Sequence, residues 1–218
     1  MMNDKTWRLR RLTVMAMMVA ISFAAVAFIR IPAVVFLKYE PKDVLLTIGA
    51  FMYGPLSGLC MSVLVALIEL VTISDTGIIG MAMNVISSSL FVCVASAIYR
   101  RKRTLSAAVL GLVCAVVAMT AGMILWNYLI TPLYMDIPRE QVAGMLMTVF
   151  APFNLLKGSI NAALVMLLYK PVTAALRSAH LLPPSDRTVQ KTRASVWLIA
   201  LFVFLSLVLV LLAWNGII

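Results

Sequence analysis

Charged residues are scarce in this sequence: Asp, Glu, Lys and Arg make up 12% of its 218 residues, whereas 63% of the residues are hydrophobic. A soluble domain has about a quarter of its residues charged and about half of them apolar. A water-soluble chain of this size could not hide so many apolar side chains in one core. The composition therefore excludes an ordinary soluble domain and predicts an integral membrane protein.

Residues that usually perform catalysis or bind metals are also few. The chain has one histidine, His180, in a polar stretch, and three cysteines, Cys60, Cys93 and Cys114, at unrelated spacings inside apolar runs. Such cysteines are most often buried and inert, so we expect neither disulfides nor a metal site. The sequence contains no phosphate-binding loop, no HExxH motif and no plausible Ser/His/Asp set. We therefore expect no enzyme activity and no cofactor.

What the sequence has instead is a series of apolar runs. A helix needs about 20 apolar residues to cross a bilayer, and the runs cover residues 12–29, 44–54, 56–73, 79–99, 105–130, 149–170 and 195–214. The first run follows a basic stretch and resembles a signal peptide, but it is long for one and ends without a clear cleavage site. We interpret it as a retained helix. The predicted fold class is all-α, a polytopic bundle of membrane helices.

The second run is short, and two observations separate it from the third. The sequence Gly54-Pro55-Leu56-Ser57-Gly58 between them is typical of a chain break. Counting the second run as a crossing also places three basic stretches on one face, namely Lys5 to Arg11, Arg100 to Arg103 and Lys170 to Arg193. That face then carries 13 of the 18 Lys and Arg residues. By the positive-inside rule it is the cytoplasmic face.

This topology accounts for the net charge of +10 without nucleic acid, and it makes anionic membrane lipid the expected partner of the basic residues. It predicts a multi-pass protein of the cytoplasmic membrane with a cytoplasmic N-terminus. Three parts are expected: a six-helix membrane domain over 1–176, a cytoplasmic linker over 177–194 and an additional transmembrane helix over 195–214. The C-terminus would then be extracytoplasmic.

Polar side chains at membrane depth are costly, and each is by default a functional hypothesis. Most of those in the predicted helices fall in the outer half of the bundle: Asn84, Asn127, Tyr128, Asn154, Lys157 and Asn161. Asn154, Lys157 and Asn161 are spaced by three and four residues, which puts them on one helix face. The distribution predicts a cup that opens outward rather than a continuous pore.

Each of these residues also has a purely structural explanation. Membrane asparagines often bond neighbouring helices, and Lys157 could simply pair with Glu69. The outer loop over 30–43 could be no more than a solvated connection. On the first helix, Ala16 and Ala20 form a small-xxx-small pattern that permits close helix approach, which is more often ordinary internal packing.

Several short motifs follow one another along residues 8–176. They are Lys38-Tyr39-Glu40-Pro41-Lys42-Asp43-Val44, Gly49-Ala50-Phe51 with Gly54-Pro55, Ser74-Asp75-Thr76-Gly77 followed by Gly80 and Asn84, Asn127-Tyr128 with Thr131-Pro132-Leu133-Tyr134, and Pro152-Phe153-Asn154-Leu155-Leu156-Lys157. The chain thereby resembles the substrate-binding (S) components of energy-coupling factor (ECF) vitamin transporters, specifically the riboflavin type. Ala16-x-x-x-Ala20 matches the alanine motif on the first helix of that family.

The resemblance implies a six-helix ECF S-component core, from which the additional helix over 195–214 departs. It implies a non-enzymatic protein that captures riboflavin from outside, in a pocket roofed by the first outer loop and lined by the fourth to sixth helices. The residues assigned to the vitamin are Lys38, Tyr39, Glu40, Asn84, Asn127, Tyr128, Asn154, Lys157 and Asn161. Ala16 and Ala20 would contact a transmembrane coupling protein, which with two ATPase subunits drives release inside as the S component topples in the membrane.

Two other functions remain open on the sequence. Within the transporters, the ligand could be another vitamin such as thiamine, a folate or a queuine-like base. Outside them, the chain could be a membrane assembly protein without transport activity, although such a protein would not need Lys157 or the clustered amides. Co-purification of a yellow flavin would separate these alternatives.

Overall fold

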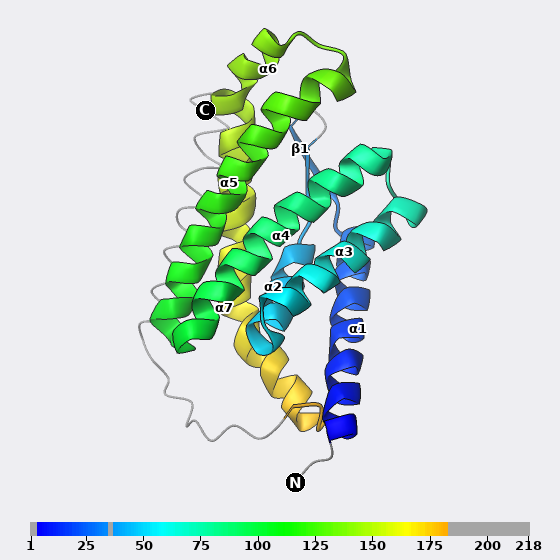
Figure 1. The fold of residues 1–218 in the computed structure, drawn as a ribbon, viewed down its shortest axis with the longest axis vertical. Coiled ribbons are helices and arrows are strands. Elements are labelled where there is room, and N and C mark those ends of the chain that lie inside the picture. Colours follow the sequence, from blue (N-terminus) through cyan, green and yellow to red (C-terminus); the bar gives the residue numbers. More distant parts are fainter. Residues whose placement is uncertain (1–3, 35–36, 183–218) are drawn as a thin grey trace.

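The computed structural model describes residues 4–34 and 37–182. Figure 1 shows that these residues form a bundle of helices with one short hairpin. The elements are α1 (Asp4–Phe28), β1 (Ile31–Val34), β2 (Leu37–Tyr39), α2 (Lys42–Tyr53), α3 (Pro55–Thr72), α4 (Gly77–Lys102), α5 (Leu105–Met135), α6 (Arg139–Met145), a π-helical turn (Leu146–Phe150) and α7 (Ala151–Ser178). The last three follow one another without a break, so the described chain has six helical rods. The helix expected over 195–214 and most of the linker expected over 177–194 lie outside the described residues.

Five of the rods in the described part are long and apolar enough to cross a membrane. They cover Trp7–Phe28, Pro55–Thr72, Gly77–Lys102, Leu105–Met135 and Arg139–Ser178. The sixth rod, α2, has 12 residues. Such a helix rises about 18 Å, short of the roughly 30 Å of a hydrocarbon core. The all-α polytopic fold is therefore confirmed, whereas the expected crossing over 44–54 is a helix too short to span a bilayer alone.

A chain break at Gly54 keeps α2 and α3 separate, as the sequence predicts. Gly54 has φ 97°, a left-handed conformation that glycine adopts without the steric cost borne by other residues. Pro55 then occupies the first turn of α3, where its missing N–H would have no partner in any case. The two helices can therefore pack side by side instead of forming one long rod.

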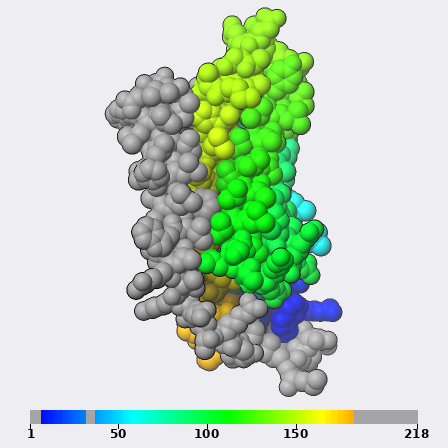
Figure 2. Space-filling view, turned by 90° about the vertical axis from the view of Figure 1, so that its left-hand side faces the viewer, coloured from blue at the N-terminus to red at the C-terminus, as the bar shows by residue number. Residues whose placement is uncertain are grey.

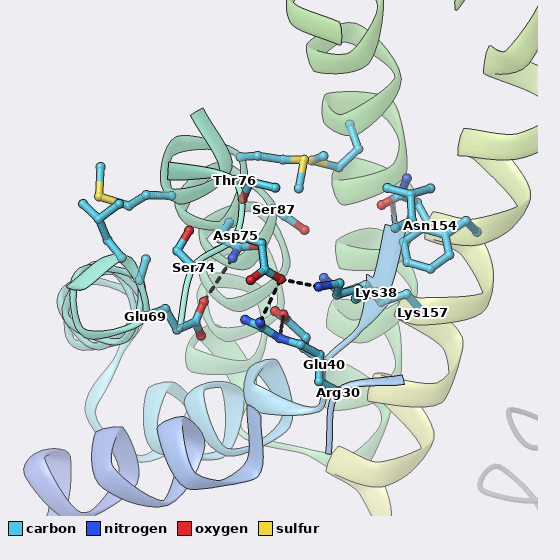
Figure 3. Close-up of a pocket in the computed structure, with 18 residues that line it drawn as sticks. Arg30, Lys38, Glu40, Glu69, Ser74, Asp75, Thr76, Ser87, Asn154 and Lys157 are labelled. Carbon is cyan, nitrogen blue, oxygen red and sulfur yellow. Dashed lines mark hydrogen bonds and ion pairs between the residues drawn. The ribbon is translucent and has the colours of Figure 1, made fainter. Parts of the chain in front are cut away.

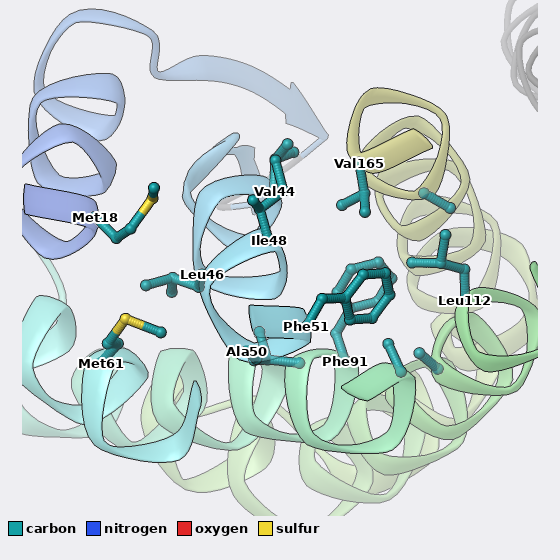
Figure 4. Close-up of a cluster of buried hydrophobic side chains, with 14 of the residues drawn as sticks. Met18, Val44, Leu46, Ile48, Ala50, Phe51, Met61, Phe91, Leu112 and Val165 are labelled. Carbon is teal, nitrogen blue, oxygen red and sulfur yellow. The ribbon is translucent and has the colours of Figure 1, made fainter. Parts of the chain in front are cut away.

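The short helix α2 is the centre of the core. Nine of its 12 residues are buried, and it packs against α1, α3, α4 and α7. Figure 4 shows side chains of α2, such as Leu46 and Ile48, in the space between Met18 of α1, Met61 of α3 and Val165 of α7. A helix surrounded in this way does not need to span the bilayer, because its neighbours provide its apolar environment.

The pair α4 and α5 is packed closely enough to require a glycine. A Cβ atom on Gly111 would lie 2.7 Å from the backbone oxygen of Ala95. The α5 helix runs along the face seen in Figure 2 and carries no charged residue. Its exposed residues include Leu110, Val117 and Leu125. In water such a surface would be an aggregation hazard, and it is the surface expected of a helix that faces lipid tails.

The segment expected to be an outer loop over 30–43 is largely ordered structure. Strands β1 and β2 form an antiparallel pair in which Ile31 lies opposite Tyr39, and α2 begins at Lys42, before the apolar run that predicts it. Figure 1 shows the hairpin above the first turn of α2. The hairpin thereby holds Lys38 and Glu40 beside the turn that joins α3 to α4.

Candidate ligand-binding site

A cavity opens between the hairpin, the α3–α4 turn, α4 and α7 (Figure 3). Its empty space, counted together with the open solvent at its mouth, is about 760 Å³. The polar residues in its lining are Arg30, Lys38, Glu40, Glu69, Ser74, Asp75, Thr76, Ser87, Asn84, Asn154 and Lys157, and the apolar ones include Leu37, Met81, Met83, Met123 and Phe153. The lining thus combines an apolar wall with several polar groups.

Below the cavity, Lys42 is enclosed by two carboxylates. Its side chain is almost wholly buried, with the residue 1% exposed. The Nζ atom donates to Glu40 Oε2 at 2.9 Å and to the two carboxylate oxygens of Glu69 at 2.8 and 2.7 Å. The sequence predicts Lys42 in an outer loop, and that prediction is wrong, because Lys42 is the buried first residue of α2. A buried charge is tolerated only when it is paired and hydrogen-bonded, and Lys42 meets both conditions.

A second buried carboxylate, Asp43, joins the first turn of α2 to α4 and α7. Its Oδ1 accepts a hydrogen bond from Ser88 Oγ, and its Oδ2 accepts one from Asn161 Nδ2 at 3.4 Å. Asn161 in turn accepts from Tyr39 Oη at 3.0 Å. Tyr39 and Asn161 therefore act together to fix the hairpin to α7, and neither is part of the cavity wall.

Lys157 differs from Lys42 because, among the described residues, no hydrogen-bond partner holds its ammonium group. It lines the cavity and is 6% exposed. Its nearest carboxylate oxygen, Asp43 Oδ2, is 3.9 Å from Nζ, which is too far for a hydrogen bond. The alternative that Lys157 pairs with Glu69 is wrong, because Glu69 is bonded to Lys42 and also accepts from Asn84 Nδ2 at 3.0 Å. Lys157 thus presents a buried ammonium group to the cavity with donors available for a ligand.

Ion pairs close the cavity on the side of the hairpin. Lys38 Nζ donates to Asp75 Oδ2, and Arg30 lies 3.6 Å from the same oxygen and 3.2 Å from Glu40 Oε1. The hydrogen bond from Lys38 lowers the pKa of the Asp75 carboxyl group. Burial alone would raise the pKa of Glu40, but the charges of Lys42, Lys157 and Arg30 together hold it below its ordinary value. Both carboxylates are therefore ionised at neutral pH and connect the hairpin to the rest of the site.

Asn84 and Asn154 line the cavity from α4 and α7. Asn154 follows the π-helical turn, and its Nδ2 donates to the carbonyl oxygen of Phe150 at 2.7 Å. Each amide uses its NH₂ group on a protein acceptor, and no hydrogen bond to either side-chain oxygen occurs among the described residues. π-Helical turns are frequent at functional sites because they redirect side chains. Both amide oxygens remain available to accept from a ligand.

Asn127 and Tyr128 do not belong to the cavity wall. Asn127 is buried within α5, where its Nδ2 donates to the Met123 oxygen at 2.7 Å and its Oδ1 accepts from Thr131 at 2.8 Å. Proline at 132 interrupts the backbone bonding of α5, and these side-chain bonds lie in the preceding turns. Tyr128 is 38% exposed, and the Arg139 guanidinium lies 5.5 Å from its ring centroid. The structure therefore brings Asn84, Asn154 and Lys157 together and leaves Asn127 and Tyr128 apart from them.

Ser87 lines the same cavity and is not predicted from the sequence. It is 3% exposed and lines the cavity one turn after Asn84, and its hydroxyl forms no hydrogen bond within the described part of the chain. A buried hydroxyl without a partner is costly, and in Figure 3 this one lies across the cavity from Lys157. A serine in an apolar helix carries little signal, since most such serines bond a backbone oxygen of their own helix.

Ala16 and Ala20 lie on the exposed side of α1 among the described residues. Another side of α1 contacts α3, where Arg11 Nη2 donates a hydrogen bond of 2.6 Å to Ser57 Oγ. Within the described bundle the two alanines are not helix-packing residues. They leave a shallow strip on which another helix could lie.

The fold and the cavity together define a multi-pass membrane protein with a polar cavity at one end of its bundle. A model of the family described as "ECF transporter, substrate-specific component" matches residues 10–169. The riboflavin transporter RibU of Staphylococcus aureus (strain TCH60) is 28% identical over 178 residues, which cover 77% of this chain and 93% of that protein. The riboflavin transporter FmnP of Bacillus subtilis (strain 168) is 26% identical over 190 residues, which cover 80% of this chain and 99% of that protein.

One solved structure has a fold similar to that of this chain. It is described as the structure and mechanism of the S component of a bacterial ECF transporter, and it matches with a TM-score of 0.66 at 26% identity, covering 78% of this chain and 99% of that one. The chain therefore belongs to the substrate-specific (S) components of ECF transporters. It is a non-enzymatic transport subunit, and such subunits work with an energizing module.

Proposed function

We propose that the ligand of this S component is riboflavin and that the vitamin binds in the cavity beneath the hairpin. The single observation that carries the proposal is the ammonium group of Lys157, which is buried in the cavity wall and 3.9 Å from its nearest carboxylate. The two riboflavin transporters at 26–28% identity support the choice of vitamin.

The chemistry of riboflavin fits the two sides of this cavity. Its ring system is flat and largely apolar, with one edge of alternating donors and acceptors, and its tail is a chain of hydroxyl groups. Lys157 can donate to a ring carbonyl and Asn154 Oδ1 can accept from a ring N–H. Phe153 and Met123 provide apolar surface for the ring. Ser74, Thr76 and Ser87 form a side of the cavity that is rich in hydroxyl groups, and this side suits the hydroxylated tail.

A binding titration tests the proposal. Purified full-length protein should quench riboflavin fluorescence with saturable one-to-one stoichiometry, because a buried flavin is shielded from water and lies against side chains. Thiamine, a folate and a queuine-like base, added in excess, should not displace it. Displacement by one of these, or the absence of any quenching, would assign the cavity to a different ligand.

Coupling to the energizing module is proposed to use the exposed strip at Ala16 and Ala20. The partners would be a transmembrane coupling protein and two ATPase subunits, on the cytoplasmic side where the N-terminus is expected. Replacing both alanines by leucine should abolish uptake by cells that express the complete transporter, because larger side chains prevent close helix approach. Riboflavin binding by the isolated variant should be unchanged. Equal loss of binding and uptake would instead make these alanines part of the internal packing.

A further inference from the structure

A series of buried polar contacts runs from the hairpin to the wall of the ligand-binding cavity. Tyr39 of β2 donates its hydroxyl hydrogen to Asn161 Oδ1 at 3.0 Å, and Asn161 Nδ2 donates to Asp43 Oδ2 at 3.4 Å. The same carboxylate oxygen lies 3.9 Å from Lys157 Nζ. Of these four residues only Lys157 lines the cavity. The contacts therefore join three residues outside the cavity wall to the cation within it.

The direction of each hydrogen bond in this series follows from the groups involved. A carboxylate only accepts, so Asn161 has to turn its NH₂ group toward Asp43 and its amide oxygen toward Tyr39. Burial and the negative charge of Asp43 raise the pKa of the Tyr39 hydroxyl, which therefore stays protonated and donates to that oxygen. Asn161 and Asp43 are both fully buried, so bulk water does not compete for these groups.

Asn161 and Lys157 compete for one oxygen of Asp43. The other oxygen, Oδ1, accepts from Ser88 Oγ. The Lys157 ammonium group is attracted by the charge of Asp43, but it would have to move roughly 1 Å closer to Oδ2 to form a normal hydrogen bond. Because Asp43 lies outside the cavity lining, that movement would take the ammonium group away from a ligand in the cavity.

We propose that Tyr39 and Asn161 are positioning residues for Lys157, which act on the ligand through this lysine and not by touching the ligand themselves. The proposal rests on the proposed function, in which Lys157 donates to riboflavin. Asn161 occupies Asp43 Oδ2 and thereby leaves the ammonium group directed at the ligand, and Tyr39 holds the Asn161 amide in the orientation that this requires. Because Tyr39 belongs to the hairpin, the hairpin influences the affinity for the ligand from outside the cavity wall.

Riboflavin titration of an Asn161→Leu variant tests the proposal. Leucine has the branched shape of asparagine but no donor for Asp43, so Lys157 should move onto the carboxylate. The affinity, measured by fluorescence quenching, should then fall about 5- to 10-fold, the loss expected when one hydrogen bond is weakened. Asp43 keeps its bond from Ser88 and gains Lys157, so the variant should fold, and the thermal midpoint without ligand checks this.

Tyr39→Phe is the second and milder variant, and it decides the question if Asn161→Leu does not fold. It removes the hydroxyl group that orients the Asn161 amide and leaves every other group in place. The affinity for riboflavin should fall about 2- to 5-fold, because the amide is still present but no longer fixed.

A double-mutant cycle with Lys157→Met separates positioning from direct contact. Without the Lys157 ammonium group there is nothing left to position, so Asn161→Leu and Tyr39→Phe should each change the remaining affinity by less than about twofold. If either substitution causes the same loss with and without Lys157, that residue contacts the ligand or only supports the fold, and the proposal is overturned.

The matched control is Tyr99→Phe. It also removes the hydroxyl group of a partly buried tyrosine, one that is hydrogen-bonded to Tyr169 at 3.2 Å, and neither tyrosine lines the ligand-binding cavity. Its affinity for riboflavin should equal that of the wild type. If the wild type does not bind riboflavin, the proposed function fails and this inference with it. If the wild type binds riboflavin and the Tyr39 and Asn161 variants bind it equally well, only the positioning role is wrong.

Discussion

Replacing Lys42 by methionine should lower the free energy of unfolding by about 3–5 kcal/mol, the cost of leaving a buried ionic group without its partner. The reason is the position of Lys42 between Glu40 and Glu69, with three hydrogen bonds of 2.7–2.9 Å. Methionine preserves the volume but leaves two buried carboxylates facing each other. The thermal midpoint in detergent should fall by about 10 °C or more, and the yield of folded protein should fall with it.

Lys38→Met is the control, because it is the same substitution in the neighbouring hairpin at a partly exposed ion pair. Its effect should be small, since exposed ion pairs contribute about 0–1 kcal/mol. Adding Glu40→Gln and Glu69→Gln to Lys42→Met should restore part of the lost stability, because the two carboxylates that lost their lysine are then neutral. A Lys42→Met protein with the thermal midpoint of the wild type would contradict the paired arrangement.

Lys157→Met should have the opposite profile: a normal fold and weak ligand binding. Asp43 loses a cation at 3.9 Å when Lys157 is removed, but it keeps its hydrogen bonds from Ser88 and Asn161, so its carboxylate stays hydrogen-bonded. A hydrogen bond from a charged donor contributes about 1.5–3 kcal/mol, which corresponds to about 10- to 150-fold in affinity. Titration of riboflavin fluorescence quenching measures the loss, and the thermal midpoint without ligand checks the fold.

Two companion variants make this result specific. Ser87→Ala removes an uncharged donor from the same cavity and should cost less, about 0.5–1.5 kcal/mol of binding free energy, with no loss of stability because its hydroxyl has no partner in the described chain. Asn127→Ala should affect the stability of α5 more than ligand binding, since the hydrogen bonds of Asn127 to other described residues lie within its own helix. Wild-type affinity in a folded Lys157→Met protein would remove Lys157 from the site.

The helices could be predicted from the sequence because each follows from a local rule. Apolar runs of membrane length mark the five long rods, and Gly54-Pro55 marks the break that isolates α2. The ends were harder to predict: α5 continues through Pro132 to Met135, and α7 continues through Pro171 to Ser178. Proline usually ends a helix in water, whereas in a membrane bundle neighbouring groups can satisfy the freed backbone oxygens.

The site was predictable only where the residue type alone is decisive. Lys157 stands alone in an apolar run, and its cost in a membrane marks it without any structural knowledge. Lys42 looks like a loop residue because Lys38, Glu40 and Asp43 surround it, and its main partner Glu69 is 27 positions away. Asn127 and Asn154 are the same residue type at similar depth. Only the packing of α5 and α7 shows that Asn154 lines the cavity and Asn127 does not.

The buried ionic cluster has a consequence for energetics across the membrane. Its cations are Arg30, Lys42 and Lys157, and its anions are Glu40, Asp43 and Glu69, so its formal charges cancel. Moving a single unbalanced charge through the transmembrane voltage takes about 2.3 kcal/mol per 100 mV. Moving this cluster through the membrane field therefore performs no net electrical work on the cluster itself. The cluster would add no voltage dependence of its own to the import of an uncharged ligand.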